Sequence, residues 1–256
     1  MPDTRPCIGL VPAAGRATRL GPLPCSKEIL PLPPGGGAPA GAQRVIADCL
    51  LEAYRIGGIK KVFIILREGK WDIPGFYGDG HRSDLHLAYL ITRYPYGTPF
   101  TLDQAYPFVR NANVALGFPD VQFRPRDVFP RLLQRLGQGD AEVVLGLFPT
   151  PNPSKADMVD CTSDGRVRDI VIKPARTSLR LGWFCAVWTP RFSIFMHDWL
   201  ARAMTGADLR THPEIYVGTV MRAALTKDMP MAAETFPEGK AVDVGTPEDL
   251  ARAATW

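Results

Sequence analysis

The stretch Cys7-Ile-Gly-Leu-Val-Pro-Ala-Ala-Gly-Arg-Ala-Thr-Arg-Leu-Gly21, followed by Ser26-Lys-Glu-Ile-Leu-Pro31, decides the fold. Its apolar start, residues 7–12, predicts a buried strand, and the small residues that follow predict a turn. Small residues let backbone N–H groups approach phosphate oxygens, while Arg and Lys neutralise phosphate charge. Neither G-x-x-x-x-G-K-[ST] nor G-x-G-x-x-G is present. We therefore predict a different kind of triphosphate-binding loop, formed by Ala13, Ala14, Gly15, Arg16, Ala17 and Thr18.

The composition is that of an ordinary globular α/β protein. The 256 residues are 46% hydrophobic and 22% charged, enough for one large domain with at most a small appendage. We expect a single domain over residues 1–256. The net charge of +4 suits anionic substrates but is too small to indicate nucleic-acid binding. No apolar segment is long enough to predict a membrane span.

The five cysteines are scattered and show no C-x-x-C spacing. This pattern favours free thiols over a disulfide framework or a zinc site. The N-terminal residues lack the apolar stretch of a signal peptide. We therefore expect a cytoplasmic protein.

Apolar runs alternate with helical periodicity along the chain. Strands are predicted over 61–66, 113–118, 142–148 and 183–188, with a hairpin over 158–161 and 167–172. Helices are predicted over 42–54, 127–136, 190–204 and 213–225, and residues 31–41 form a Pro/Gly/Ala-rich surface loop. Residues 241–244 lead into a helix with Thr246 as N-cap, Pro247 as first residue and Asp249 as capping-box partner. This order predicts a mixed sheet with helices on both faces.

The opening motif resembles the signature of the sugar-1-phosphate nucleotidyltransferases, (L/I)-x-P-A-A-G-x-G-T-R-(L/M)-x-P followed by P-K-x-L-L-P. Ala17 stands where that family has its second Gly, and Ser26 where it usually has Pro. The Ala17 change is mild if its φ is negative. The resemblance runs from about Ile8 to Ala253. It implies an α/β fold of the nucleotide-diphospho-sugar transferase type, a Rossmann-like three-layer sandwich with a mixed, mostly parallel sheet.

The resemblance also implies an activity, the transfer of an NMP group from an NTP to a sugar-1-phosphate with release of pyrophosphate. Such a reaction needs in-line placement and charge neutralisation rather than a general base. Arg19 would grip the β- and γ-phosphates, Lys27 would neutralise the α-phosphate, and Lys173 of Val171-Ile-Lys-Pro174 would hold the sugar phosphate. The structural alternatives are a solvated surface lysine at position 27 and a strand-end lysine at position 173.

Two carboxylates match the positions where the family binds magnesium. Asp120 follows a predicted strand, and Asp243 belongs to Asp243-Val-Gly-Thr-Pro-Glu-Asp249, which matches the family's D-x-G-T-P-E-D. Two carboxylates with waters and phosphate oxygens satisfy octahedral Mg²⁺. Asp120 as a turn cap and Asp243 as an ordinary loop residue are the structural alternatives.

The segment Tyr77-Gly-Asp-Gly80 resembles the family's Y-G-D-G loop. Periodicity alone permits a helix over 81–91, but on the resemblance we predict a strand over 85–92. Thr92 then takes the position of the base-reading Gln. Gly97 and Thr98 match the family's G-T-A, with Thr98 as cap and Pro99 as first residue of a helix reaching over 102–110.

Departures from the family gather where the acceptor would bind. Ile172 replaces a Glu that accepts bonds from sugar hydroxyls. In the strand that begins at Trp183, Phe184 stands where the family has a Gly that allows close approach. A hydroxyl-rich sugar would leave hydroxyls unpaired there, which is costly. We expect an unusual acceptor, such as a deoxygenated sugar phosphate. The alternatives are a cytidylyltransferase for a phospho-alcohol such as phosphocholine, and a non-catalytic nucleotide-sugar sensor. A homo-oligomer is possible.

Overall fold

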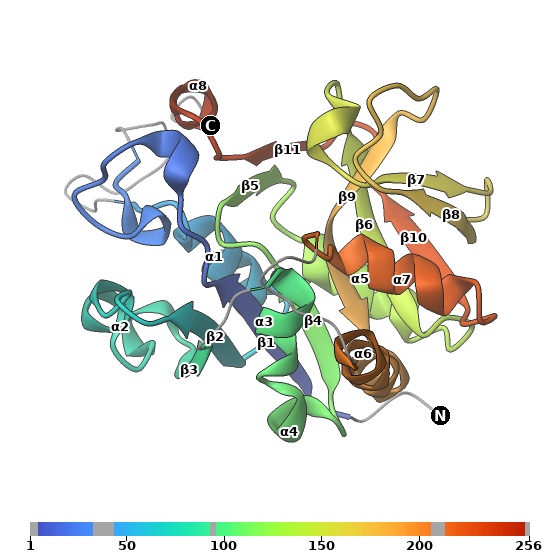
Figure 1. Cartoon of the computed structure of the whole chain (residues 1–256), viewed down its shortest axis with the longest axis horizontal. Coiled ribbons are helices and arrows are strands. Elements are labelled where there is room, and N and C mark those ends of the chain that lie inside the picture. The colour runs from blue at the N-terminus through green and yellow to red at the C-terminus, as the bar shows by residue number, and fades with distance from the viewer. Residues whose placement is uncertain (1–4, 33–43, 93–95, 206–212, 254–256) are drawn as a thin grey trace.

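The computed structural model describes residues 5–32, 44–92, 96–205 and 213–253, and the remaining residues are grey in Figure 1. A central sheet runs through the molecule in the order β10-β6-β9-β4-β1-β2-β3, with β7 paired to β9 and β8 to β7. Its strands are β1 (Cys7–Ala13), β2 (Lys61–Arg67), β3 (His86–Thr92), β4 (Asn113–Gly117), β6 (Val143–Pro149), β7 (Met158–Cys161), β8 (Val167–Val171), β9 (Leu181–Trp188) and β10 (Met231–Thr235). The β1–β2, β1–β4, β2–β3 and β6–β10 pairs are parallel, whereas β9 is antiparallel to β4 and β6.

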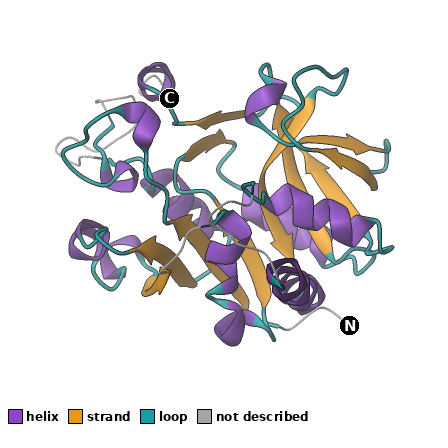
Figure 2. Cartoon of the chain, viewed as in Figure 1, coloured by secondary structure: helices purple, strands orange, loops and turns teal. Residues whose placement is uncertain are grey.

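Helices cover both faces of this sheet (Figure 2). The longer helices are α1 (Asp48–Ile56), α5 (Val128–Leu136), α6 (Pro190–Met204) and α7 (Val217–Leu225), and the shorter ones are α2 (Asp72–Tyr77), α3 (Thr98–Asp103), α4 (Tyr106–Val109) and α8 (Pro247–Ala253). One apolar cluster joins α1 and α5 to the sheet, and a second joins α3, α6 and α7 to it. The predicted three-layer α/β fold with a mixed, mostly parallel sheet is confirmed.

Strand β1 lies between β2 and β4 and is apolar on both faces because both are covered. Leu10 is paired with Phe63 on one side and Leu116 on the other. The buried Tyr54 of α1 reaches the sheet, with its hydroxyl 2.8 Å from the Leu10 carbonyl oxygen. Helix α1 is therefore fixed directly beneath the strand that carries the predicted phosphate loop.

The helix predicted over 102–110 is wrong in its extent. The chain forms α3 from Thr98 and then, separately, α4 from Tyr106. Pro107 has no N–H to donate to the preceding turn, so it ends one helix and occupies the first turn of another. Gly97, rather than Thr98, is the N-cap of α3, and no side chain caps it.

Most other predicted elements are confirmed within a few residues. The strand predicted over 85–92 is β3, and the helix predicted over 213–225 begins only at Val217. Residues 33–43, which include most of the predicted loop and the start of the helix predicted over 42–54, lie outside the described residues. Thr246 and Asp249 form the predicted capping box, since the Asp249 N–H donates to the Thr246 hydroxyl at 3.3 Å. In addition, α2, β10 and the strand β5 (Val121–Arg124) were not predicted.

Three segments distant in sequence meet beyond the carboxyl end of β1, at the top of Figure 1. They are the turn η2 (Lys27–Ile29), the antiparallel ribbon of β5 and β11 (Lys240–Asp243), and α8. A small apolar cluster of Ile46, Val244 and Ala253 holds them together. Ligand sites of open α/β sheets lie at this edge. Across the described ranges we find no helix with the length and apolar character that crossing a bilayer requires.

Candidate active site

The loop after β1 has the backbone of an anion-binding site. The N–H groups of Gly15, Arg16 and Ala17 donate to no other described residue. Gly15 and Arg16 are exposed, and a Cβ added at Gly15 would meet nothing within 4 Å. Successive unused N–H groups flanked by arginines can receive phosphate oxygens. The predicted triphosphate loop is thus open to a ligand.

The expectation that Ala17 is a mild replacement for Gly required a negative φ, and the structure shows a positive φ instead. Its φ of 53° and ψ of 30° place it in the left-handed region, as N-cap of the short turn η1 (Thr18–Leu20). An alanine there is strained by about 1 kcal/mol or more because its Cβ crowds the backbone. The loop therefore keeps the conformation that a glycine would favour, at a cost in stability.

Lys27 lies on a turn that two interactions hold in place. The carboxylate of the neighbouring Glu28 accepts hydrogen bonds from Lys70 Nζ at 2.6 and 2.8 Å, and both side chains are buried. The Ser26 N–H and hydroxyl donate to the Asp72 carboxylate at 2.6 and 2.7 Å. Ser26, which departs from the family motif, therefore anchors this turn to the start of α2.

The ammonium of Lys27 lies against the two predicted metal ligands. Its Nζ is 2.5 Å from Asp120 Oδ2. Asp243 is at the end of β11, where it pairs with Val121, and the next N–H, of Val244, donates to the Asp120 carbonyl at 2.9 Å. The ribbon thus brings together three residues that span more than 200 positions of the chain, from Lys27 to Asp243. Burial tends to lower the pKa of Lys27, but Asp120 and then Asp243 raise it above its usual value.

The Asp120 and Asp243 carboxylates fit a divalent cation. Burial, and then the negative charge of Asp120, raise the pKa of Asp243 to about 6. Asp243 Oδ1 is buried and has no hydrogen-bond partner among the described residues. Carboxylate oxygens are among the donors that Mg²⁺ prefers. Across the described chain no cluster of three or more His, Cys, Asp or Glu forms a complete metal cage, so phosphate oxygens and waters would have to complete the coordination.

Arg19 lies beside Asp243 in the same site. A Cβ added to Gly245 would lie 3.2 Å from Arg19 Nη2, so the guanidinium packs on the backbone that follows Asp243. Its positive charge lowers the pKa of Asp243, against the effect of burial. Arg19, Lys27 and the two carboxylates therefore form one cluster, which we call the charged cluster.

A cavity of about 190 Å³ opens beside the charged cluster. It is lined by Thr98, Phe118, Asp120, Val121, Lys155, Ala156, Asp157, Lys173, Trp183, Phe184, Glu214, Tyr216, Val217 and Asp243. Lys173 has a left-handed φ of 38°, and its Nζ lies 3.6 Å from the centre of the Tyr216 ring. Such backbone strain is concentrated at functional sites. The predicted Lys173, Trp183 and Phe184 thus share one cavity with both predicted metal ligands.

Ile172 and Thr92, which were predicted for the acceptor and for the base, are not among the residues that line this cavity. Ile172 packs toward α7, where a Cβ on Gly218 would be 2.9 Å from its Cδ1. Thr92 is only 2% exposed, at the carboxyl end of β3. Gly97 is adjacent to the cavity: its φ is 122°, and a Cβ there would lie 2.5 Å from the Ile215 carbonyl oxygen. A side chain at position 97 would therefore push away the segment that carries Tyr216.

Four polar cavity residues were missed in the sequence, namely Lys155, Asp157, Glu214 and Tyr216. Asp157 directly precedes a strand and is buried, a placement that an isolated acidic residue does not reveal. Lys155 Nζ lies 3.1 Å from Asp249 Oδ2, so this rim residue connects the turn η4 (Pro153–Lys155) to α8. No sequence pattern links these residues, because only the fold brings them together.

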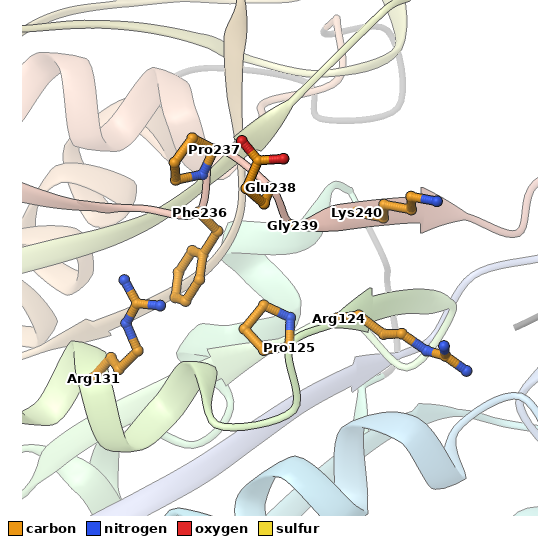
Figure 3. A pocket seen from close by; sticks show the side chains of 8 residues that line it. All are labelled: Arg124, Pro125, Arg131, Phe236, Pro237, Glu238, Gly239 and Lys240. Carbon is orange, nitrogen blue, oxygen red and sulfur yellow. The ribbon is translucent and has the colours of Figure 1, made fainter. Parts of the chain in front are cut away.

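A larger cavity, of about 680 Å³, lies elsewhere and lacks such chemistry (Figure 3). Of its lining residues only Glu238 is acidic. Arg131 is stacked over the Phe236 ring at 4.3 Å and pairs with Glu234. Volume alone would favour this cavity as the active site, but the paired carboxylates and the adjoining predicted phosphate loop favour the smaller cavity.

No protein-family model matches the sequence, and no curated protein does either. Solved structures do match. A putative glucose-1-phosphate thymidylyltransferase from Bacillus anthracis, crystallised with a sucrose, has a TM-score of 0.81 at 16% identity, over 97% of this chain and 94% of that one. A UDP-glucose pyrophosphorylase complexed with UDP-glucose has a TM-score of 0.77 at 16% identity, over 97% of both chains. The chain therefore has the fold of these sugar-1-phosphate nucleotidyltransferases over nearly its whole length.

Proposed function

We propose that the protein transfers an NMP group from an NTP to a sugar-1-phosphate, giving an NDP-sugar and pyrophosphate. The observation that carries this proposal is the charged cluster, in which Lys27, Asp120 and Asp243 meet beside the open loop after β1. The two solved structures with this fold bear the names of enzymes of this class, which supports the proposal.

The reaction follows from the placement of charge. A phosphate oxygen of the acceptor attacks the α-phosphorus, the bond to the bridging oxygen of the β-phosphate breaks, and that electron pair leaves with pyrophosphate. The unused N–H groups of residues 15–17 with Arg16 and Arg19 would bind the departing phosphates, and Lys27 would face the α-phosphate. Lys173 would hold the acceptor phosphate across the cavity. No side chain has to take up a proton from the nucleophile, because a phosphate oxygen is already ionised.

Asp120 and Asp243 would hold Mg²⁺, which supplies charge neutralisation at the α-phosphate when bound. Since only two carboxylates converge there, we expect the free protein to bind Mg²⁺ weakly and an NTP to complete the site. A cytoplasmic location, a homo-oligomer and a single domain stay predictions from the sequence.

One other acceptor has an observation in its favour. Trp183, Phe184 and Tyr216 line the cavity together with Asp157 and Glu214, and aromatic faces beside carboxylates can bind a quaternary ammonium group. Phosphocholine is therefore the second candidate acceptor. A non-catalytic sensor of nucleotide sugars would share the fold without turnover.

The test is pyrophosphate release from a grid of NTPs against sugar-1-phosphates and phosphocholine. Lys173→Ala should raise the acceptor KM at least tenfold and leave the NTP KM nearly unchanged, because Lys173 would contact the acceptor phosphate and not the NTP. Lys227→Ala, a surface lysine just after α7, is the matched control and should behave as wild type. Full turnover by Lys173→Ala at low acceptor concentration would exclude the role assigned to Lys173.

A further inference from the structure

Two buried polar atoms of the cavity lack partners. Asp157 is 8% exposed and Trp183 is 6% exposed, and both line the cavity. Among the described residues, neither Asp157 Oδ1 nor the Trp183 indole Nε1 makes a hydrogen bond. A buried acceptor and a buried donor without partners each cost about 1–3 kcal/mol. Such atoms are rare in folded proteins, and a bound ligand, water or ion is among the explanations for them.

The two groups are neighbours. The Trp183 backbone N–H donates to the Asp157 carbonyl at 3.2 Å. Burial raises the pKa of Asp157, while Lys173 and the indole N–H of Trp183 act to lower it. The indole is thus near the carboxylate, although its N–H makes no hydrogen bond to it.

The surroundings fix the carboxylate in place. A Cβ on Gly218 would lie 2.2 Å from Asp157 Oδ2, so the carboxyl group packs against the first turn of α7 where only glycine leaves room. The Trp183 ring packs against Phe118 with ring centroids 5.7 Å apart. Each side chain is thus packed against a neighbouring element, an arrangement that helps to preorganise a recognition site.

We propose that Asp157 and Trp183 together recognise one hydroxyl group of the acceptor. Asp157 Oδ1 would accept a hydrogen bond from the hydroxyl O–H, and the Trp183 indole N–H would donate one to the hydroxyl oxygen. This inference rests on the proposed function and names its acceptor class, a sugar phosphate with a hydroxyl at that position. A hydroxyl satisfies both atoms at once because it is donor and acceptor. A quaternary ammonium group satisfies neither, since it has no N–H to donate and no lone pair to accept.

The inference changes the expectation drawn from Ile172. That residue removes a carboxylate from one side of the acceptor, but its side chain packs toward α7 rather than into the cavity. Asp157 supplies a carboxylate from the neighbouring strand end. We therefore infer that hydroxyl recognition has moved to another position and has not been lost.

The experiment measures kcat/KM for glucose-1-phosphate and for its monodeoxy analogues, each lacking one ring hydroxyl, with wild type, Asp157→Asn and Trp183→Phe. Wild type should discriminate against one analogue by at least 100-fold, because a site built to bind a hydroxyl rejects a ligand without it. Both variants should lose most of that discrimination and treat the other analogues as wild type does. Asp160→Asn, in the same strand region but outside the cavity lining, is the matched control.

The possible outcomes separate the two proposals. Wild type without turnover on any acceptor would refute the proposed function and the inference together. Turnover of phosphocholine alone, or turnover of sugar phosphates with unchanged discrimination in both variants, would overturn the inference. Circular dichroism and thermal unfolding would check that the variants fold. We expect Asp157→Asn to fold because it removes a buried charge.

Discussion

The buried pair of Glu28 and Lys70 should be essential for stability. Their side chains are 5% and 4% exposed, and Lys70 Nζ donates to both Glu28 oxygens at 2.6 and 2.8 Å. Burial lowers the pKa of Lys70 in spite of Glu28, which shows how strongly this site disfavours an uncompensated charge. Lys70→Met would leave the Glu28 carboxylate buried and alone, a change that typically costs 3–5 kcal/mol.

The stability lost in Lys70→Met should depend on pH in a defined direction. The orphaned carboxyl group can take up a proton, which costs about 1.4 kcal/mol for each pH unit above its ordinary pKa of about 4.3. This limits the charge penalty to about 4 kcal/mol at pH 7 and about 1 kcal/mol at pH 5. Because protonation removes the uncompensated charge, the stability lost relative to wild type should be smallest at low pH and should grow as pH rises.

Urea unfolding of wild type and Lys70→Met at pH 5 and pH 7 measures this difference. Lys60→Met is the matched control, since Lys60 pairs with Asp84 on the surface and its loss should be small at both pH values. Glu28→Gln combined with Lys70→Met should remove the pH dependence. A loss that is equal at the two pH values, or no larger than that of Lys60→Met, would refute the reasoning.

Three further predictions concern the phosphate loop, the metal ligands and the core. Ala17→Gly should raise the free energy of unfolding by about 0.5–1 kcal/mol because it relieves a left-handed φ, whereas Ala14→Gly should lower it; equal effects in thermal unfolding would exclude strain at Ala17. Asp243→Asn should abolish pyrophosphate release yet stabilise the metal-free protein above pH 6 by up to about 3 kcal/mol. The reason is that the pKa of Asp243 is raised to about 6, so wild-type stability falls as pH rises from 4 to 6. Unfolding in EDTA that shows a less stable variant at pH 8 would contradict this. Tyr54→Phe should cost about 1–2 kcal/mol, because its buried hydroxyl lies 2.8 and 2.9 Å from two strand carbonyls, and an unchanged urea midpoint would exclude that contribution.

The sequence was most informative where local chemistry and backbone geometry coincide. The apolar run before Ala13 predicted β1, and Thr246 with Asp249 predicted the start of α8, because both signals act within a few residues. The helix predicted over 102–110 from the family motif and its cap was wrong in its extent, because Pro107 separates α3 from α4.

The candidate site was only partly predictable, because its residues come together through long-range pairing. Lys27 and Asp243 could be singled out from motifs, but their proximity depends on the ribbon of β5 and β11, and β5 was not predicted. Asp157 could not be found at all, because an acidic residue before a strand is ordinarily exposed. The residue that leaves room for its carboxylate, Gly218, lies 61 positions further along the chain.

The central claim is that the charged cluster and the adjoining cavity catalyse nucleotidyl transfer. The most direct measurement is pyrophosphate release with an NTP and a sugar-1-phosphate, in Mg²⁺ and in EDTA, for wild type and Lys27→Met. The account predicts release that needs both substrates and the metal, and that falls by at least 100-fold in Lys27→Met. Binding of NTP without release for any pair of substrates would contradict it and would favour a nucleotide-sugar sensor.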